Sequence, residues 1–239
     1  MTWPASITMS PRNLAALVAS ALVVAEPRGG QRGDQSWTDQ FEVASDELAS
    51  TGRNPYFVLE PGYRLVLEEG TTRLIVTVLP ETKQVNGVET RVVEERESHG
   101  GQLVEVSRNY FAISTRTNSV FYFGEDVDMY KEGRVVSHEG AWRAGRNGAR
   151  FGLAMPGLAL LGSRYYQEIA PKVAMDRARI VSTGGTLETP AGTFSRLLRV
   201  EESTPLEPGT VEHKLYAPGI GLVQDGSLKL VRHGMNVVP

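Results

Sequence analysis

Apolar and polar side chains alternate along most of this chain, in short runs that are separated by glycine, proline and asparagine. The clearest example is Thr186–Val223, where two alternating runs lie between turn signals at Pro190–Gly192, Pro205–Gly209 and Ala217–Gly219. Proline fixes φ for a turn and glycine accepts a positive φ, so each cluster ends one strand and starts the next. The pattern predicts an antiparallel meander.

The alternation continues over the rest of the chain after Asn54 and predicts roughly twelve strands and an all-β fold. Asn86–Gly87 is the strongest hairpin signal, because both residues tolerate the positive φ of a type I′ turn. The strand number favours a closed or half-closed antiparallel barrel, and a two-sheet β-sandwich is the alternative. Gly145–Gly162 has no clear period, and we expect a loop with one short helical turn there. The strands are expected at Tyr63–Glu69, Thr71–Leu79, Val88–Glu97, Gln102–Ile113, Val120–Gly124, Arg134–Glu139, Arg164–Ala170, Lys172–Ser182, Thr193–Ser203, Thr210–Ala217, Leu222–Gln224 and Leu228–Val237.

The N-terminus has the features of a secretory signal peptide. Arg12 precedes the apolar run Leu14–Ala25, which is too short to span a bilayer comfortably, and Val23 and Ala25 are small residues at the cleavage positions. We therefore expect a signal peptide over residues 1–25, a polar, glycine-rich linker over 26–54, a single barrel-like domain over 55–239, and a secreted protein without a membrane span. An amphipathic N-terminal helix of a cytoplasmic protein is the alternative.

Composition limits the possible partners. The chain has 239 residues, 41% of them hydrophobic, which is enough for a sizeable core, and it has no cysteine for disulfides. The formal net charge of -3 argues against general attraction to nucleic acid or to an anionic membrane surface. We expect no nucleic acid, and a small molecule or another protein as the partner.

The sequence has none of the common motifs for nucleotide, zinc-protease or serine-nucleophile chemistry, so we expect no cofactor. His99, His138, His213 and His233 are too far apart to predict a transition-metal site. Glu125–Asp128 brings three carboxylates together after an aromatic strand, and such a loop can bind Ca²⁺. The full twelve-residue calcium-loop pattern is missing, so we predict no metal site, with calcium binding as the alternative.

The segments Pro190–Phe194 (PAGTF) and Tyr216–Val223 (YAPGIGLV) resemble the closing motif of an uncharacterised family of secreted all-β proteins of bacteria, especially actinobacteria. The resemblance covers most of Asn54–Val223, and it implies export and a lipid-binding-like or half-barrel fold without implying a reaction. Members of that family have an acidic residue in the segment that is Tyr110–Thr115 here, and this chain has none there. Other segments that share the resemblance are Asn54–Phe57, Tyr122–Asp126, Glu139–Trp142 and Tyr166–Glu168.

Polar side chains recur at every second residue in two C-terminal strands, with Glu201 on one and Glu212, Lys214 and Tyr216 on the next. Because the Pro205–Gly209 turn joins the strands, we expect their polar faces to meet, with Glu201 beside Lys214 or Glu212. Their apolar faces should then meet as well, and the residues expected to share a core face are Leu198, Val200, Val211 and Leu215.

This polar face has two interpretations: a solvated outer surface with cross-strand ion pairs, or the polar lining of a ligand cavity. In the second interpretation, Lys214 would orient an anionic or carbonyl-bearing ligand. The predicted acid–base residues are Glu125, Glu201 and Lys214, and the predicted ligand-binding residues are Tyr122, Trp142, Tyr166, Glu168 and Tyr216.

Three functions remain open at this point. The first is a secreted barrel that binds a small apolar or amphipathic molecule, with Phe151–Leu161 as its lid, and the absence of catalytic motifs favours it. The second is a cofactor-independent enzyme, a cyclase, isomerase or hydrolase that uses Glu, Lys and Tyr in an enclosed cavity. The third is a cell-surface structural or interaction domain that meets its partner through a sheet edge.

We expect signal peptidase to cleave after Ala25, so the exported protein should begin at Glu26. N-terminal sequencing of protein recovered from the medium of expressing bacteria checks this. A mature cytosolic chain that retains Met1 would contradict it.

Overall fold

The computed structural model describes residues 36–238, and the described residues from Trp37 onward form one compact unit. The predicted signal peptide lies outside the described residues, as does most of the part of the linker that precedes Trp37. The described residues form twenty β-strands, and their helical structure is limited to a 3₁₀ turn over Ser45–Glu47. The all-β prediction is confirmed.

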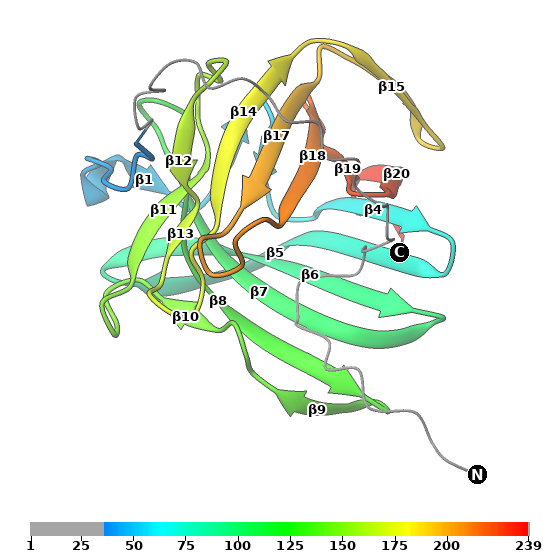
Figure 1. Ribbon diagram of the computed structural model, residues 1–239, viewed down its shortest axis with the longest axis horizontal. Coiled ribbons are helices and arrows are strands. Elements are labelled where there is room, and N and C mark those ends of the chain that lie inside the picture. The colour runs from blue at the N-terminus through cyan, green and yellow to red at the C-terminus, as the bar shows by residue number, and fades with distance from the viewer. Residues whose placement is uncertain (1–35, 239) are drawn as a thin grey trace, which may run out of the picture. The chain divides into compact units, whose positions relative to one another are not determined.

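Antiparallel pairing joins sixteen strands into one sheet whose main path has thirteen strands. β12 and β13 form the two ends of this path, yet they follow each other in the chain with Gln167 between them. The sheet therefore curves back on itself as a nearly closed barrel, as Figure 1 shows. The path runs through β12 (Arg164–Tyr166), β14 (Arg177–Thr183), β17 (Leu198–Ser203), β18 (Val211–Ala217), β19 (Gly221–Asp225), β20 (Leu228–Met235), β4 (Tyr63–Glu69), β5 (Thr72–Val85), β6 (Val88–His99), β7 (Gln102–Ser114), β8 (Val120–Lys131), β11 (Arg150–Met155) and β13 (Glu168–Ile169).

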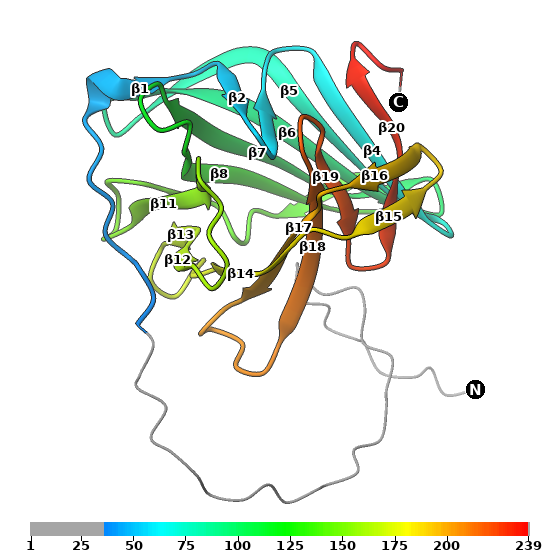
Figure 2. The same cartoon turned by 90° about the horizontal axis from the view of Figure 1, so that it is seen from above.

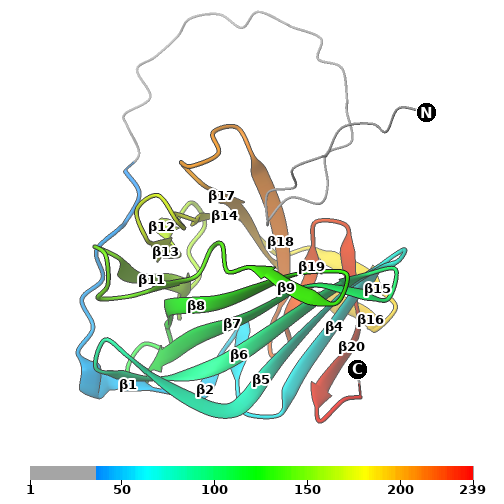
Figure 3. The same ribbon diagram turned by 90° about the horizontal axis from the view of Figure 1, so that it is seen from below.

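Figure 3 shows β4 to β8 side by side as one curved wall of the barrel. The predicted hairpin at Asn86–Gly87 joins β5 and β6, and both turn residues have a positive φ, 48° and 78°. Short strands and two hairpins add to the main path, and they are β1 (Leu48–Ala49), β9 (Arg134–Ser137), β10 (Trp142–Arg143), the pair β2 (Gly52–Asn54) and β3 (Phe57–Leu59), and the pair β15 (Thr186–Thr189) and β16 (Gly192–Ser195).

Several predicted boundaries are wrong for local reasons. The expected linker ends too late, because Thr38 already exchanges backbone hydrogen bonds with Arg164 and Tyr166. The expected loop Gly145–Gly162 contains β11 and no helical turn. Gly152 interrupts the period of this strand, since a Cβ there would lie 2.4 Å from the carbonyl oxygen of Gln167.

The expected strand Val120–Gly124 also continues, as β8, to Lys131. Gly124 makes this possible: its φ of 137° suits glycine, and Trp142 of β10 approaches so closely that a Cβ would lie 2.4 Å from its carbonyl oxygen. In the C-terminal half, the expected strand Thr193–Ser203 is divided into β16 and β17, where Arg196 has a φ of 56°.

The β17–β18 hairpin around Pro205–Gly209 is confirmed, but the predicted partners on its faces are wrong. Leu198 lies opposite Tyr216, and Val200 lies opposite Lys214. Residues directly opposite each other in an antiparallel pair share a face. The buried Leu198 and Val200 therefore share the interior face with Lys214 and Tyr216, whereas Val211 is on the outer face and is 50% exposed.

One end of the barrel is filled by apolar side chains beneath the β2–β3 hairpin, which lies beside β7 in Figure 2. Phe57 packs edge-on against Phe111, with ring centroids 5.1 Å apart, and Leu59 is fully buried. The Asn54 side-chain amide donates to the carbonyl oxygens of Asn118 and Pro156 and so fixes the hairpin to neighbouring loops. The interior at the opposite end is polar.

Leu198→Ala should lower the free energy of unfolding by about 2–5 kcal/mol, because it leaves a cavity at a fully buried position. Arg199→Ala, at the next residue on the exposed face of β17, should change it by less than about 0.5 kcal/mol. Urea unfolding followed by circular dichroism measures both, and equal losses would contradict this assignment of the interior face.

Candidate functional site

Six polar side chains, which we call the interior cluster, lie on the inner face of the sheet, on β12 and on the three consecutive strands β17, β18 and β19. The cluster consists of Tyr165, Glu202, Glu212, Lys214, Tyr216 and Asp225. Register places them on this face: Ala178 lies opposite both Tyr165 and Glu202, and Val200 lies opposite Lys214. Ala178 is fully buried and Val200 is 1% exposed, so the face that they share with the cluster is the interior of the barrel.

Lys214 lies at the centre of this cluster. Its Nζ is 2.8 Å from Oε2 of Glu202 and 3.8 Å from Oδ2 of Asp225. The other oxygen of Glu202 accepts a hydrogen bond of 3.0 Å from the side-chain amide of Gln167. The Lys214 and Asp225 side chains point inward, yet they are 24% and 23% exposed, so solvent reaches this part of the interior.

Burial and charge act against each other on these groups. Burial alone would lower the pKa of Lys214, but the charges of Asp225 and Glu202 outweigh it and raise that pKa well above its ordinary value. Burial raises the pKa of Asp225, although the Lys214 charge opposes the shift. Burial likewise raises the pKa of Glu212. Lys214 therefore stays charged, while two carboxyl groups beside it hold their protons to a higher pH than usual.

Tyr165 places a buried hydroxyl group without a hydrogen-bond partner in the described residues on the interior face. Its side chain is 3% exposed, and among the described residues its Oη has no hydrogen-bond partner. Burial and the nearby Glu202 charge raise its pKa, so the hydroxyl remains protonated. An unsatisfied buried hydroxyl costs about 1–3 kcal/mol, which makes this group a candidate contact for a ligand.

A second interior group, which we call the aromatic wall, consists of the stacked or edge-on rings of Phe111, Tyr122 and Trp142. Ring centroids are 4.6 Å apart for Phe111 and Tyr122, and 5.4 Å apart for Tyr122 and Trp142. The Trp142 indole donates a hydrogen bond of 2.7 Å to Oε2 of the buried Glu168. Because Glu168 follows Gln167 in the chain, one strand segment contacts both the aromatic wall and the interior cluster.

The structure brings most of the predicted site residues to the interior of the barrel and leaves two outside. Glu201 is on the outer face of β17, where it pairs with Arg179 at 2.8 Å. Tyr166 is also on the outer side, where its ring meets Trp37 edge-on at 6.4 Å. The prediction that Glu201 lies beside Lys214 or Glu212 is therefore wrong, because Glu201 lies opposite His213 on the other face of the sheet. The predicted residues that face the interior are Tyr122, Glu125, Trp142, Lys214 and Tyr216. Glu168 is buried and bonds to Trp142, and its partner in the strand register is Phe151.

Sequence reasoning missed Glu202, Asp225 and Tyr165. A signal for Glu202 was present, because a hairpin centred on Glu207 pairs residues equidistant from that position and so places Glu202 opposite Glu212. Asp225 reaches the cluster because β19 pairs with β18, and Tyr165 reaches it because β12 pairs with β14. The alternation of residues within one strand does not predict which strands pair.

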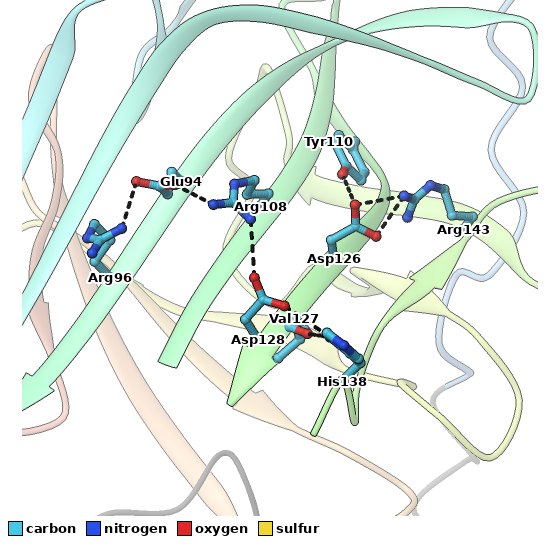
Figure 4. Close-up of polar contacts among 9 residues, drawn as sticks. All are labelled: Glu94, Arg96, Arg108, Tyr110, Asp126, Val127, Asp128, His138 and Arg143. Carbon is cyan, nitrogen blue, oxygen red and sulfur yellow. Dashed lines mark hydrogen bonds and ion pairs between the residues drawn. The ribbon is translucent and has the colours of Figure 1, made fainter. Parts of the chain in front are cut away.

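The outer face of β6 to β9 carries a separate polar network, drawn in Figure 4. Asp126 pairs with Arg143 at 2.6 Å and accepts a hydrogen bond of 2.6 Å from Tyr110, while Asp128 pairs with Arg108 at 3.3 Å and His138 at 3.0 Å. These are cross-strand ion pairs of modest energy on a partly exposed face.

This network also corrects the expected acidic loop at Glu125–Asp128. The segment is part of strand β8, and alternation turns Glu125 to the interior while Asp126 and Asp128 face outward. The three carboxylates therefore do not converge on a calcium ion. Within residues 36–238, no group of three or more His, Cys, Asp or Glu side chains is arranged to hold a metal ion.

A pocket of about 310 Å³ lies beside β10, and Trp142 is the predicted ligand-binding residue that it contains. A second pocket of about 240 Å³ is lined by Lys83, and both pockets include Arg143 and Arg146. Neither contains a member of the interior cluster. The cluster and these pockets are thus separate features.

Comparison with protein-family models, with curated proteins and with solved structures gives no match for this chain. No helix in residues 36–238 has the length and apolar character needed to cross a membrane.

The raised pKa of Glu212 predicts a pH-dependent effect of Glu212→Gln. A carboxyl group whose folded-state pKa is raised contributes stability below its unfolded pKa of about 4, and this contribution is lost as pH rises through the folded-state pKa. The free energy of unfolding of the parent protein, minus that of Glu212→Gln, should therefore fall as pH rises from about 4 through the raised pKa of Glu212. Urea titrations at a series of pH values measure the difference. Glu188→Gln, at an exposed site on β15, is the control, and a difference that rises with pH for Glu212→Gln would contradict the assignment.

Proposed function

We propose that this protein is a secreted β-barrel that binds a small amphipathic molecule inside the barrel, with the interior cluster as its polar anchor. The single observation that carries this proposal is the buried Tyr165 hydroxyl, which has no partner among the described residues and lies on the same interior face as Glu202. A ligand that offers a polar group at this point would satisfy it.

Two further features support the proposal. The Lys214 and Asp225 side chains are polar and partly accessible to solvent, which gives a ligand a point of approach to the cluster. The aromatic wall makes a neighbouring part of the same interior apolar, and ligand sites commonly combine apolar walls with a few polar anchors.

Acid–base catalysis is the second candidate function, and one observation favours it. Asp225 and Glu212 have raised pKa values beside the charged Lys214, so they could exchange protons nearer to neutral pH than ordinary carboxyl groups. The two candidates differ in the fate of the bound compound: a binding protein returns it unchanged, and an enzyme returns it with an altered mass.

Tyr165→Phe should separate ligand binding from folding. Removal of an unsatisfied hydroxyl should leave the free energy of unfolding unchanged or raise it by about 1 kcal/mol, whereas it should weaken ligand binding severalfold. The probes are octylamine, octanol and octanoate, which share one chain length, and native mass spectrometry and titration calorimetry measure their binding. Tyr166→Phe, one residue away on the outer face, is the matched control and should bind like the parent.

Two results would count against the proposal. One is the absence of binding by any of the three probes, together with no co-purified small molecule in the native mass spectrum. The other is equal binding by the parent, Tyr165→Phe and Tyr166→Phe, which would move the site away from the interior cluster.

A further inference from the structure

Carboxyl groups outnumber cations around the candidate ligand position. Glu202, Glu212 and Asp225 belong to the interior cluster, and within residues 36–238 the cation that pairs with these carboxyl groups is Lys214. Glu97 of β6 adds another carboxyl group whose pKa is raised by burial and by the charge of Asp225. One ammonium group cannot neutralise this set once its members are ionised.

The carboxylate nearest to Lys214 is already occupied. Glu202 receives the short contact from Lys214 at 2.8 Å and the hydrogen bond from Gln167. Asp225 lies farther from Lys214, at 3.8 Å, so it keeps oxygen lone pairs for another donor. An anionic ligand group would have to displace these contacts and would be repelled by the remaining carboxylates, whereas an ammonium group would be attracted.

We infer that the ligand of the interior cluster is a cationic amphiphile, an amine whose ammonium group binds at Asp225 and Tyr165 while its apolar chain lies along the aromatic wall. This inference rests on the proposed function and specifies its ligand class. An ammonium group has three donors, which suit the Asp225 carboxylate and the oxygen of the neutral Tyr165 hydroxyl. Hydrogen bonds to charged groups are the stronger kind, so charge should dominate the selectivity.

Binding should depend on pH in a defined direction. The charges of Lys214 and Glu202 act on the pKa of Asp225. The Asp225 charge in turn raises the pKa of Glu97 and of Glu212, and the Asp176 charge also raises that of Glu212. Because burial raises the pKa of both Asp225 and Glu212, these carboxyl groups keep their protons to a higher pH than ordinary carboxyl groups. An alkylamine stays charged throughout this range. Its affinity should therefore increase as pH rises through the raised carboxyl pKa values.

The test is titration calorimetry with octylamine, octanol and octanoate against the full chain at a series of pH values. We expect octylamine to bind at least about tenfold more tightly than octanol, and octanoate to bind most weakly. Asp225→Asn, which keeps the size but removes the charge, should reduce octylamine affinity at least about tenfold and flatten its pH dependence. Glu201→Gln is the matched control, because it removes a carboxylate from the outer face of the neighbouring strand β17.

The outcomes separate this inference from the proposed function. If octanoate or octanol binds as tightly as octylamine, the interior binds ligands but the assignment of a cationic ligand is overturned. Tight binding of octanoate would instead support Lys214 as the residue that anchors an anionic ligand. If no probe binds, the proposed function itself fails. Should Asp225→Asn not fold, the pH series on the parent protein still decides, since octylamine affinity that is flat or falls with rising pH contradicts the inference.

Discussion

The ammonium group of Lys214, 2.8 Å from Glu202 and 3.8 Å from Asp225, lies on the interior face of a nearly closed barrel. Removing a charge from water costs several kcal/mol unless a counter-charge compensates for it. Each partner here depends on the other: the carboxylates keep Lys214 charged against burial, and Lys214 opposes the burial that raises the pKa of Asp225. The polar half of the interior can exist because this pairing holds on three adjacent strands.

Individual strands carry both halves of the interior. Along β17, the inward-facing residues change from Leu198 and Val200 to Glu202, and along β7 they change from Phe111 to Asn109. Apolar side chains of the half beneath the β2–β3 hairpin, such as Leu59 and Phe111, are almost fully removed from water and so stabilise the fold. This division lets one barrel combine an apolar core with the polar, partly exposed side chains of the opposite half.

Period-two alternation and turn chemistry were sufficient to predict the all-β fold, most strands and the β5–β6 and β17–β18 hairpins. They did not predict β11, because close backbone contact requires a glycine in this strand and so interrupts the alternation of side chains. Gly152 approaches the carbonyl oxygen of Gln167. Alternation also grouped Glu212, Lys214 and Tyr216 correctly on one face. It does not predict the face of Glu201, because the register of this hairpin is set by the centre of its turn, which pairs Glu202 with Glu212 and turns Glu201 to the other face.

Tyr165 shows what strand order adds to these local rules. Buried polar groups in native proteins are nearly always hydrogen-bonded, and a phenylalanine would fill the same space without the cost of an unsatisfied hydroxyl. Its position on β12, at the closure of the barrel, brings it to the same face as Glu202 through Ala178 of β14. Two residues later in the same segment, Gln167 donates to Glu202, and Glu168 then accepts from Trp142. The segment from Tyr165 to Glu168, which closes the barrel, thus contains the unsatisfied hydroxyl, a partner of the charged cluster and a partner of the aromatic wall. A molecule with a polar group and an apolar chain would meet all three along this one segment.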